Sequence, residues 1–221
     1  MATSGTRTFN LDIAEIVEEA YERCGLEVRT GYDAKTARRS LNLMFAEWAN
    51  RGLNLWTVDS KEITLAQGQA SYTLLPDVVD LLDVVVRRNN TDYEVQRISR
   101  GEYTTLPNKT TQGRPSQYWF NRQIDPVINL WAVPENSTDV LIYYYVERIE
   151  DAGGYPNTSD LPFRFFPCMV AGLAYYLAMK RAPDRIQMLK TVYEEEFQRA
   201  ADEDQGRTPL KLQPSLSYLR V

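Results

Sequence analysis

The sequence contains no histidine, and this absence narrows the possible chemistry at once. Ser-His-Asp and Cys-His nucleophile systems, histidine general bases and His-ligated zinc or iron sites all require the imidazole ring. Most common hydrolase mechanisms are therefore excluded. Paired carboxylates remain the one catalytic chemistry to consider.

Cysteine is nearly absent as well, with only Cys24 and Cys168, which lie far apart in the sequence. Each falls within a helical pattern of apolar residues, so neither a disulfide framework nor a CxxC metal or redox site is indicated. We expect both side chains to be buried small hydrophobes. We expect no metal and no cofactor.

Long apolar runs and a basic excess are also missing. The longest apolar stretch, residues 168–179, is too short to span a bilayer, and residues 1–7 lack the apolar core of a secretion signal. We therefore expect a soluble protein made in a cytoplasm, without membrane contact. The 25 Lys and Arg residues stand against 30 Asp and Glu residues, so no global positive charge favours nucleic-acid binding, although a local basic patch is possible.

The motifs of nucleotide, calcium and esterase sites do not occur either. The candidate carboxylate groups are Glu18 with Glu19, Asp80 with Asp83, Glu150 with Asp151, and the run 194–196. Each has a simpler interpretation as a solvated helix face or a turn. Catalysis is thus possible but unsupported, and we predict that the protein is not an enzyme.

Helical periodicity marks both ends of the chain. Apolar residues recur at helical spacing from about residue 13 to 24 and from 37 to 48, with Asn10 and Asp33 as candidate N-caps. Trp48 lies on the apolar stripe of the second helix and is predicted to be buried. The same spacing returns over residues 163–177 and 186–200, with Pro183 between the two segments.

The middle of the chain has the alternation typical of strands. We predict strands at residues 61–65, 71–74, 81–88, 93–98, 117–121, 127–133 and 140–147. Residues 89–92 form a turn cluster between two of them. Residues 99–115 have no periodicity and are predicted to be a contact loop or a short helix.

The order of these segments predicts an α+β fold. The N-terminal and C-terminal helix pairs would form a four-helix bundle, with an antiparallel β insert projecting from one end and an extended C-terminal tail. The corresponding divisions are residues 1–56 and 153–205 for the bundle, 57–152 for the insert and 206–221 for the tail.

Three surface features suggest contacts. Basic clusters occur at Lys35, Arg38 and Arg39 and around residues 87–100, where salt bridges are the default interpretation over phosphate contact. The aromatic runs at 118–120 and 143–145 must each present one face outward, and we favour a subunit interface there. Residues 206–221 combine leucines, prolines and three basic residues with no acid, which indicates a segment that folds onto a partner.

Several motifs resemble a known family. They are LNLMFAEWANRG at 41–52, GRPSQY at 113–118, LWAVPE at 130–135 and LPF at 161–163. Together with the opening helix they resemble the head-to-tail adaptors of short-tailed bacteriophages, also called tail tubular protein A, and the resemblance extends from about residue 9 to 205. These motifs are not catalytic.

The resemblance implies a structural role in the virion. A ring of about twelve copies would dock beneath the portal protein, extend the DNA channel, retain the packaged genome and offer a platform to tail nozzle or tail fibre proteins. Double-stranded DNA would pass through without sequence-specific binding. Assembly would take place in the host cytoplasm. By this resemblance the C-terminal segment is the portal-docking arm, with contact residues Arg207, Leu210, Lys211, Leu212, Tyr218, Leu219 and Arg220.

Two other functions compete with this interpretation. A virion-associated cell-wall hydrolase could use a Glu/Asp pair and would not need histidine, but no acid lies in a recognisable cleft motif. A bacterial carbohydrate-binding module would be expected as one compact β-domain, and the predicted flanking helices count against it.

Overall fold

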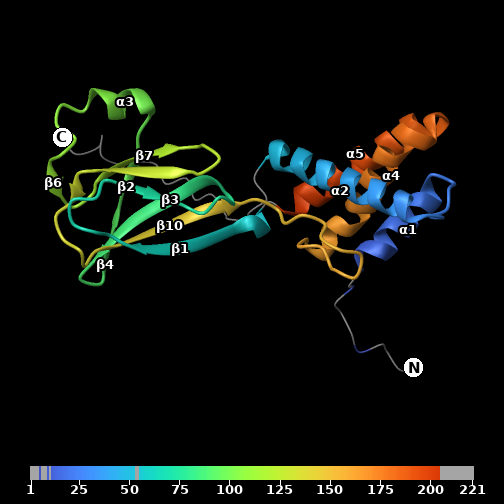
Figure 1. Cartoon of the computed structure of the whole chain (residues 1–221), viewed down its shortest axis with the longest axis horizontal. Coiled ribbons are helices and arrows are strands. Elements are labelled where there is room, and N and C mark those ends of the chain that lie inside the picture. Colours follow the sequence, from blue (N-terminus) through green and yellow to red (C-terminus); the bar gives the residue numbers. More distant parts are fainter. Residues whose placement is uncertain (1–4, 6–8, 10, 53–54, 205–221) are drawn as a thin grey trace, which may run out of the picture.

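The computed structural model describes residues 5, 9, 11–52 and 55–204. The molecule is elongated, with helices at one end and strands at the other (Figure 1). We call these parts the helical lobe (α1, α2, α4 and α5) and the strand lobe (the β-strands and α3). Each lobe has a hydrophobic core of its own.

The helical lobe is formed by segments from both ends of the described chain. Its helices are α1 at Ile13–Arg23, α2 at Gly31–Arg51, α4 at Phe166–Arg181 and α5 at Ile186–Glu203. Short 3-10 turns flank them at Leu55–Thr57 (η1), Phe163–Phe165 (η2) and Pro183–Arg185 (η3). None of the helices among the described residues is both long enough and apolar enough to cross a lipid bilayer.

The predicted four-helix bundle made of two helix pairs is wrong. Within the described ranges the chain has five α-helices and ten strands in three sheets. In the helical lobe, α1 and α2 barely contact each other, and both pack against α4 instead. The reason is that α4 is buried over most of its circumference, so the other helices surround it. An apolar stripe shows that a helix is packed, but it does not identify the neighbour.

The helix starts also differ from the predicted caps. The N-cap of α1 is Asp12, whose carboxylate accepts from the Glu15 amide at 2.8 Å, while Asn10 lies outside the described residues. The N-cap of α2 is Thr30, and the predicted cap Asp33 is the third helical residue that completes the capping box. Both starts are therefore Ser/Thr/Asp-type capping boxes with the acid three residues later.

The strand lobe contains two four-stranded sheets that share one core. The first sheet has the order β1 (Val58–Thr64), β10 (Val140–Glu147), β3 (Val78–Arg88) and β4 (Thr91–Glu94). The second has the order β2 (Ser71–Thr73), β8 (Val127–Trp131), β7 (Gln117–Asn121) and β5 (Gln96–Arg97). A third, two-stranded sheet joins β6 (Gln112–Gly113) and β9 (Val133–Pro134).

The predicted all-antiparallel insert also requires correction, because β5 pairs with β7 and β6 with β9 in parallel. Strand β5 comes just before the segment that leads to β7, and β6 lies near the end of that segment. That segment contains α3 (Arg100–Thr105), which begins at a capping box between Ser99 and Glu102. Of the two alternatives for residues 99–115, the short helix is therefore confirmed.

Several local predictions are confirmed. Cys24 and Cys168 are buried free thiols, and Trp48 is fully buried. Asn89 and Asn90 both have positive φ angles and connect β3 to β4, as the turn cluster predicted. Strands β7 and β10 have the predicted bounds.

Candidate functional site: the cleft between the two lobes

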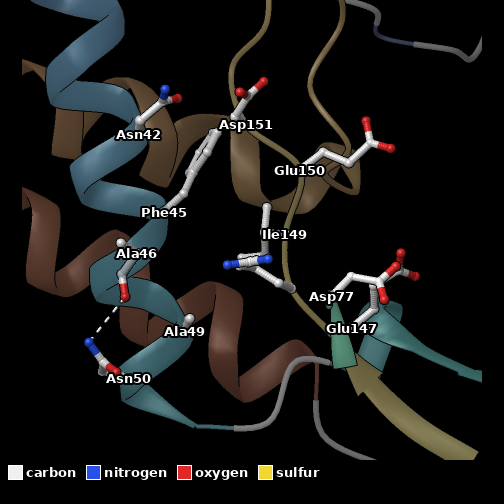
Figure 2. Close-up of a pocket in the computed structure, with 11 residues that line it drawn as sticks. Asn42, Phe45, Ala46, Ala49, Asn50, Asp77, Glu147, Ile149, Glu150 and Asp151 are labelled. Atoms are coloured by element: carbon white, nitrogen blue, oxygen red, sulfur yellow. Dashed lines mark hydrogen bonds between the residues drawn. The ribbon is translucent and has the colours of Figure 1, made fainter. Parts of the chain in front are cut away.

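A cleft of about 780 Å³ lies where the strand lobe meets α2. One wall is the side of α2 that presents Asn42, Phe45, Ala46, Ala49 and Asn50 (Figure 2). The opposite wall is the chain just before β3 together with the end of β10 and the residues that follow it. It presents Asp77, Glu147, Arg148, Ile149, Glu150 and Asp151. The cleft thus combines an apolar floor with a rim of carboxylates.

Backbone contacts hold the acidic wall in place. The Arg148 amide donates to the Asp77 carbonyl at 2.9 Å, and the Arg148 guanidinium donates to the Pro76 carbonyl at 3.2 Å. Farther along, the Ala152 amide donates to the Asn42 side chain of α2 at 2.9 Å. These contacts fix the chain after β10 against the segment before β3 and against α2.

Two of the carboxyl groups in the cleft, those of Asp77 and Glu147, lie side by side (Figure 2). Glu147 is opposite Val78 in the register of β10 and β3, which brings it beside Asp77. Burial, and then the hydrogen bond and negative charge of Asp77, raise the pKa of Glu147 above its ordinary value. The two carboxyl groups therefore favour a state that shares a proton.

The acidic residues near the cleft also affect the pKa of a buried tyrosine, Tyr145. Tyr145 is fully buried, and its hydroxyl donates to the Asp59 carboxylate at 3.4 Å. Burial, followed by the charges of Glu147 and Asp59, raises the pKa of Tyr145 to about 12. This phenol remains protonated at neutral pH and acts as a hydrogen-bond donor.

This arrangement suits binding better than glycoside hydrolysis. A carboxylate-dependent glycosidase needs its two carboxyl groups about 5 to 9.5 Å apart so that a sugar or water fits between them. Asp77 and Glu147 instead lie side by side (Figure 2), and Asp77 is close enough to raise the pKa of Glu147. An apolar floor with acids at the rim can accept a basic side chain that buries its stem and keeps its charge at the edge.

The carboxylates singled out from the sequence do not assemble into a catalytic pair. Glu18 and Glu19 lie on the exposed face of α1. Asp80 is paired with Arg97 at 2.9 Å and with Arg122 at 3.7 Å. Glu194 is paired with Arg51, and Glu195 and Glu196 with Arg199. Glu150 and Asp151 do reach the cleft, as exposed residues on its rim.

The two basic clusters have different surroundings. Around the β3–β4 hairpin, Arg87 pairs with Asp92 at 2.7 Å, and Arg88 pairs with the buried Asp139 at 2.6 Å. Salt bridging is therefore confirmed for Arg87 and Arg88, and also for Arg97, which pairs with Asp80. On α2, by contrast, Lys35 and Arg39 have no carboxylate partner among the described residues.

The aromatic runs alternate faces as predicted. Tyr118 and Phe120 are buried, whereas Trp119 is half-buried and packs against Tyr103 of α3, with ring centroids 5.4 Å apart. Tyr143 and Tyr145 are buried, and Tyr144 is 44% exposed between them. A subunit interface at these residues remains a prediction.

The predicted portal-docking residues, Arg207 to Arg220, lie outside the described residues. The pair Asp77 and Glu147 was missed in the sequence because the two residues are 70 positions apart and only the strand register joins them. In the described part of the chain, no group of three or more His, Cys, Asp or Glu side chains is placed to hold a metal ion.

The fold and its surfaces together fit a protein that joins other proteins. Its two lobes expose charged faces and an open cleft, and its candidate acids are mostly tied in ion pairs. The comparison with protein families agrees with this class. The model of the family described as SU10 adaptor protein matches residues 12–213, and the chain belongs to that family.

The family gives the chain a structural role as a phage head-tail adaptor in the virion. Such a role implies contacts with other head and tail proteins and needs no catalysis. A search among curated proteins found no match.

Proposed function

We propose that this protein is a head-to-tail connector of the tail tubular type. About twelve copies would form a ring beneath the portal protein, as closed heterologous contacts allow. The ring would extend the DNA channel, retain the packaged genome and provide the platform for tail attachment. The observation that carries the proposal is the match to the adaptor family over nearly the whole described chain.

Four kinds of contact follow from this proposal. The ring would contact the portal protein on one side and tail nozzle or tail fibre proteins on the other. Neighbouring copies would contact each other within the ring. Double-stranded DNA would pass through the centre without sequence-specific binding. The protein would be assembled in the host cytoplasm and would remain at the head-tail junction of the virion.

The C-terminal segment is proposed as the portal-docking arm. Arg207, Lys211 and Arg220 would find acidic surface on the portal, while Leu210, Leu212, Tyr218 and Leu219 would fill its pockets. The segment carries no acid, in contrast to the acidic outer face of α5 that precedes it. Each arm would bind weakly, and the ring would multiply the affinity.

Deletion of residues 206–221 tests this arm. We expect the truncated protein to keep the melting temperature of the full chain, because both described cores are built from residues before 206. We also expect it to lose attachment to portal rings in a sedimentation assay. Unchanged portal binding would refute the arm. A collapsed melting temperature would show that the segment belongs to the core.

A further inference from the structure

The exposed face of α2 carries a group of basic residues without acidic partners. Lys35, Arg38, Arg39, Asn42 and Leu43 line a shallow groove of about 300 Å³ on this helix. Arg38 donates to the Gly153 carbonyl at 3.1 Å. In the residues that the structure describes, no carboxylate pairs with any of the three cations. We call these five residues the basic α2 face.

Two further cationic side chains, from the end of α4, lie next to the basic α2 face. Lys180 donates to the Ser40 hydroxyl of α2 at 2.6 Å, and Arg181 pairs with Asp33 at 2.6 Å. Burial, and then the charges of Arg39 and Arg181, lower the pKa of Lys180. The local potential is therefore positive. Leu43 adds an apolar contact, because 55% of its surface is exposed.

The exposed face of α1 has the opposite character. An apolar groove of about 430 Å³ runs between α1 and α4, with Glu15, Glu19 and Arg23 at its edge. Its apolar lining comes from Leu11, Ile16, Phe166, Pro167 and Val170. We call this groove, together with Glu18 and Glu22 on the outer side of α1, the acidic α1 face.

Glu18 and Glu22 distinguish α1 from the other acidic helix. Both are exposed, and neither has an ion-pair partner within the described ranges. On α5, by contrast, Glu194 is paired with Arg51, and Glu195 and Glu196 are paired with Arg199. Glu18 and Glu22 therefore add unpaired negative charge to the outer side of α1.

The two faces belong to helices on different sides of α4. Phe166 and Val170 of α4 line the α1 groove, whereas Gly172 lies against Met44 of α2. The helices α1 and α2 come together mainly where the Tyr21 hydroxyl donates to the Asp33 carbonyl at 3.1 Å. One copy cannot bring its own two faces together, but two copies can.

We propose that the basic α2 face of one copy docks onto the acidic α1 face of a second copy. The contact is head-to-tail, because different surfaces of the two copies meet, and such contacts generate rings when the rotation closes. It rests on the ring of the proposed function and names the surfaces that form it. Lys35 and Arg39 meet Glu18 and Glu22, and Leu43 enters the groove beside Ile16.

Electrostatic complementarity of this kind sets partner orientation and the association rate, and it weakens as salt rises. The test reverses the charge on each face separately. One variant is Lys35→Glu/Arg39→Glu, and the other is Glu18→Lys/Glu22→Lys. All four side chains are exposed, and none takes part in a described cap or ion pair. A control variant, Arg100→Glu/Lys109→Glu, makes the same change on the strand lobe.

The readout is the number of adaptor copies bound to each portal ring, by native mass spectrometry, together with the melting temperature. We expect each face variant alone to lose the filled ring, and the control to keep it. An equal mixture of the two face variants restores the ring, because every contact in an alternating ring again joins opposite charges. Filled rings from either variant alone, or no restoration by the mixture, would overturn the proposal.

Two further outcomes of the experiment distinguish failure of the proposed function from failure of the proposed contact. If the wild-type protein does not bind portal rings at all, the proposed function fails, whatever the variants do. The Lys35→Glu/Arg39→Glu variant could instead form the filled ring normally but lose binding of a short DNA duplex. In that case the basic α2 face binds DNA phosphates, and the head-to-tail contact is refuted.

Discussion

At the residue scale, Trp48 joins α2 to α5 through a chain of two hydrogen bonds. Its indole N–H donates to the Tyr193 hydroxyl of α5 at 2.8 Å, and that hydroxyl donates to the Glu47 carboxylate at 2.8 Å. The Arg51 guanidinium lies over the Phe197 ring at 4.3 Å. Trp48 also packs against Phe165, just before α4, with ring centroids 5.7 Å apart.

Truncation of Trp48 should therefore be costly. We expect Trp48→Ala to lower the free energy of unfolding by about 3–5 kcal/mol, because it leaves a large cavity among buried aromatic rings. Chemical denaturation of the variant and the wild type measures the difference. A loss below about 1 kcal/mol, which is typical of exposed positions, would show that Trp48 is not a core anchor.

The acidic pair of the cleft predicts a pH-dependent effect. Burial first, and Asp77 second, raise the pKa of Glu147 in the folded state, so the folded protein holds this proton more tightly than the unfolded chain. The resulting stabilisation is complete below the unfolded-chain pKa and is lost as the pH rises through the folded-state pKa. Ionisation of Glu147 is therefore less favourable in the folded protein than in the unfolded chain.

Glu147→Gln removes the ionisable carboxyl group and its negative charge. We expect the variant to melt at a higher temperature than the wild type at pH 7, and the difference to disappear near pH ~4, around the ordinary glutamate pKa. Glu150→Gln, an exposed change on the same rim, serves as the control and should melt like the wild type at both pH values. A lower melting temperature for Glu147→Gln at pH 7 would contradict the interpretation.

At the scale of elements, α4 controls the packing of the helical lobe. At Gly172, side chains of both α2 and α5 pack closely against this helix. A Cβ atom there would lie 2.4 Å from the Met44 sulfur and 2.8 Å from the Tyr193 ring. The methionine can move, but the tyrosine is held by its hydrogen bonds to Trp48 and Glu47.

Gly172→Ala should therefore destabilise the protein although alanine favours helices. Overpacking costs about 1–3 kcal/mol, which outweighs a propensity gain of about 1 kcal/mol. Gly101→Ala in α3 is the matched control, since its Cβ would meet only the Ser99 hydroxyl at 3.8 Å. Denaturation should show a loss for Gly172→Ala and no loss for Gly101→Ala. Equal effects at the two sites would refute the close-packing argument.

Element types were more predictable than their partners. Helical and alternating patterns identified the helices and strands because periodicity is a local property of each segment. The central position of α4 was not predictable, because helical spacing of apolar residues shows that a helix is packed but does not identify its neighbours. The pairing of Asp77 with Glu147 likewise depends on the register of two distant strands. The portal-docking segment stays a prediction.

At the scale of the whole molecule, assembly should depend on the portal. The helical lobe presents one basic and one acidic face, and exposed ion pairs are worth little individually. We therefore expect the isolated protein to be monomeric or weakly associated at low micromolar concentration, and to form rings only when portal rings array many copies. Native mass spectrometry without portal checks this. A stable closed ring in that experiment would contradict it.

The strand lobe leaves and rejoins the helices at a single point, because Val58 of β1 pairs with Val146 of β10. Paired strand residues lie only about 4.5–5.5 Å apart, a gap that a two-residue hairpin turn can bridge. The strand lobe is thus an insertion whose two ends lie next to each other, so it could be removed or transferred as one unit, which we call the cassette. Such an attachment lets the cassette change in length and sequence while the helices that carry both charged faces stay in place.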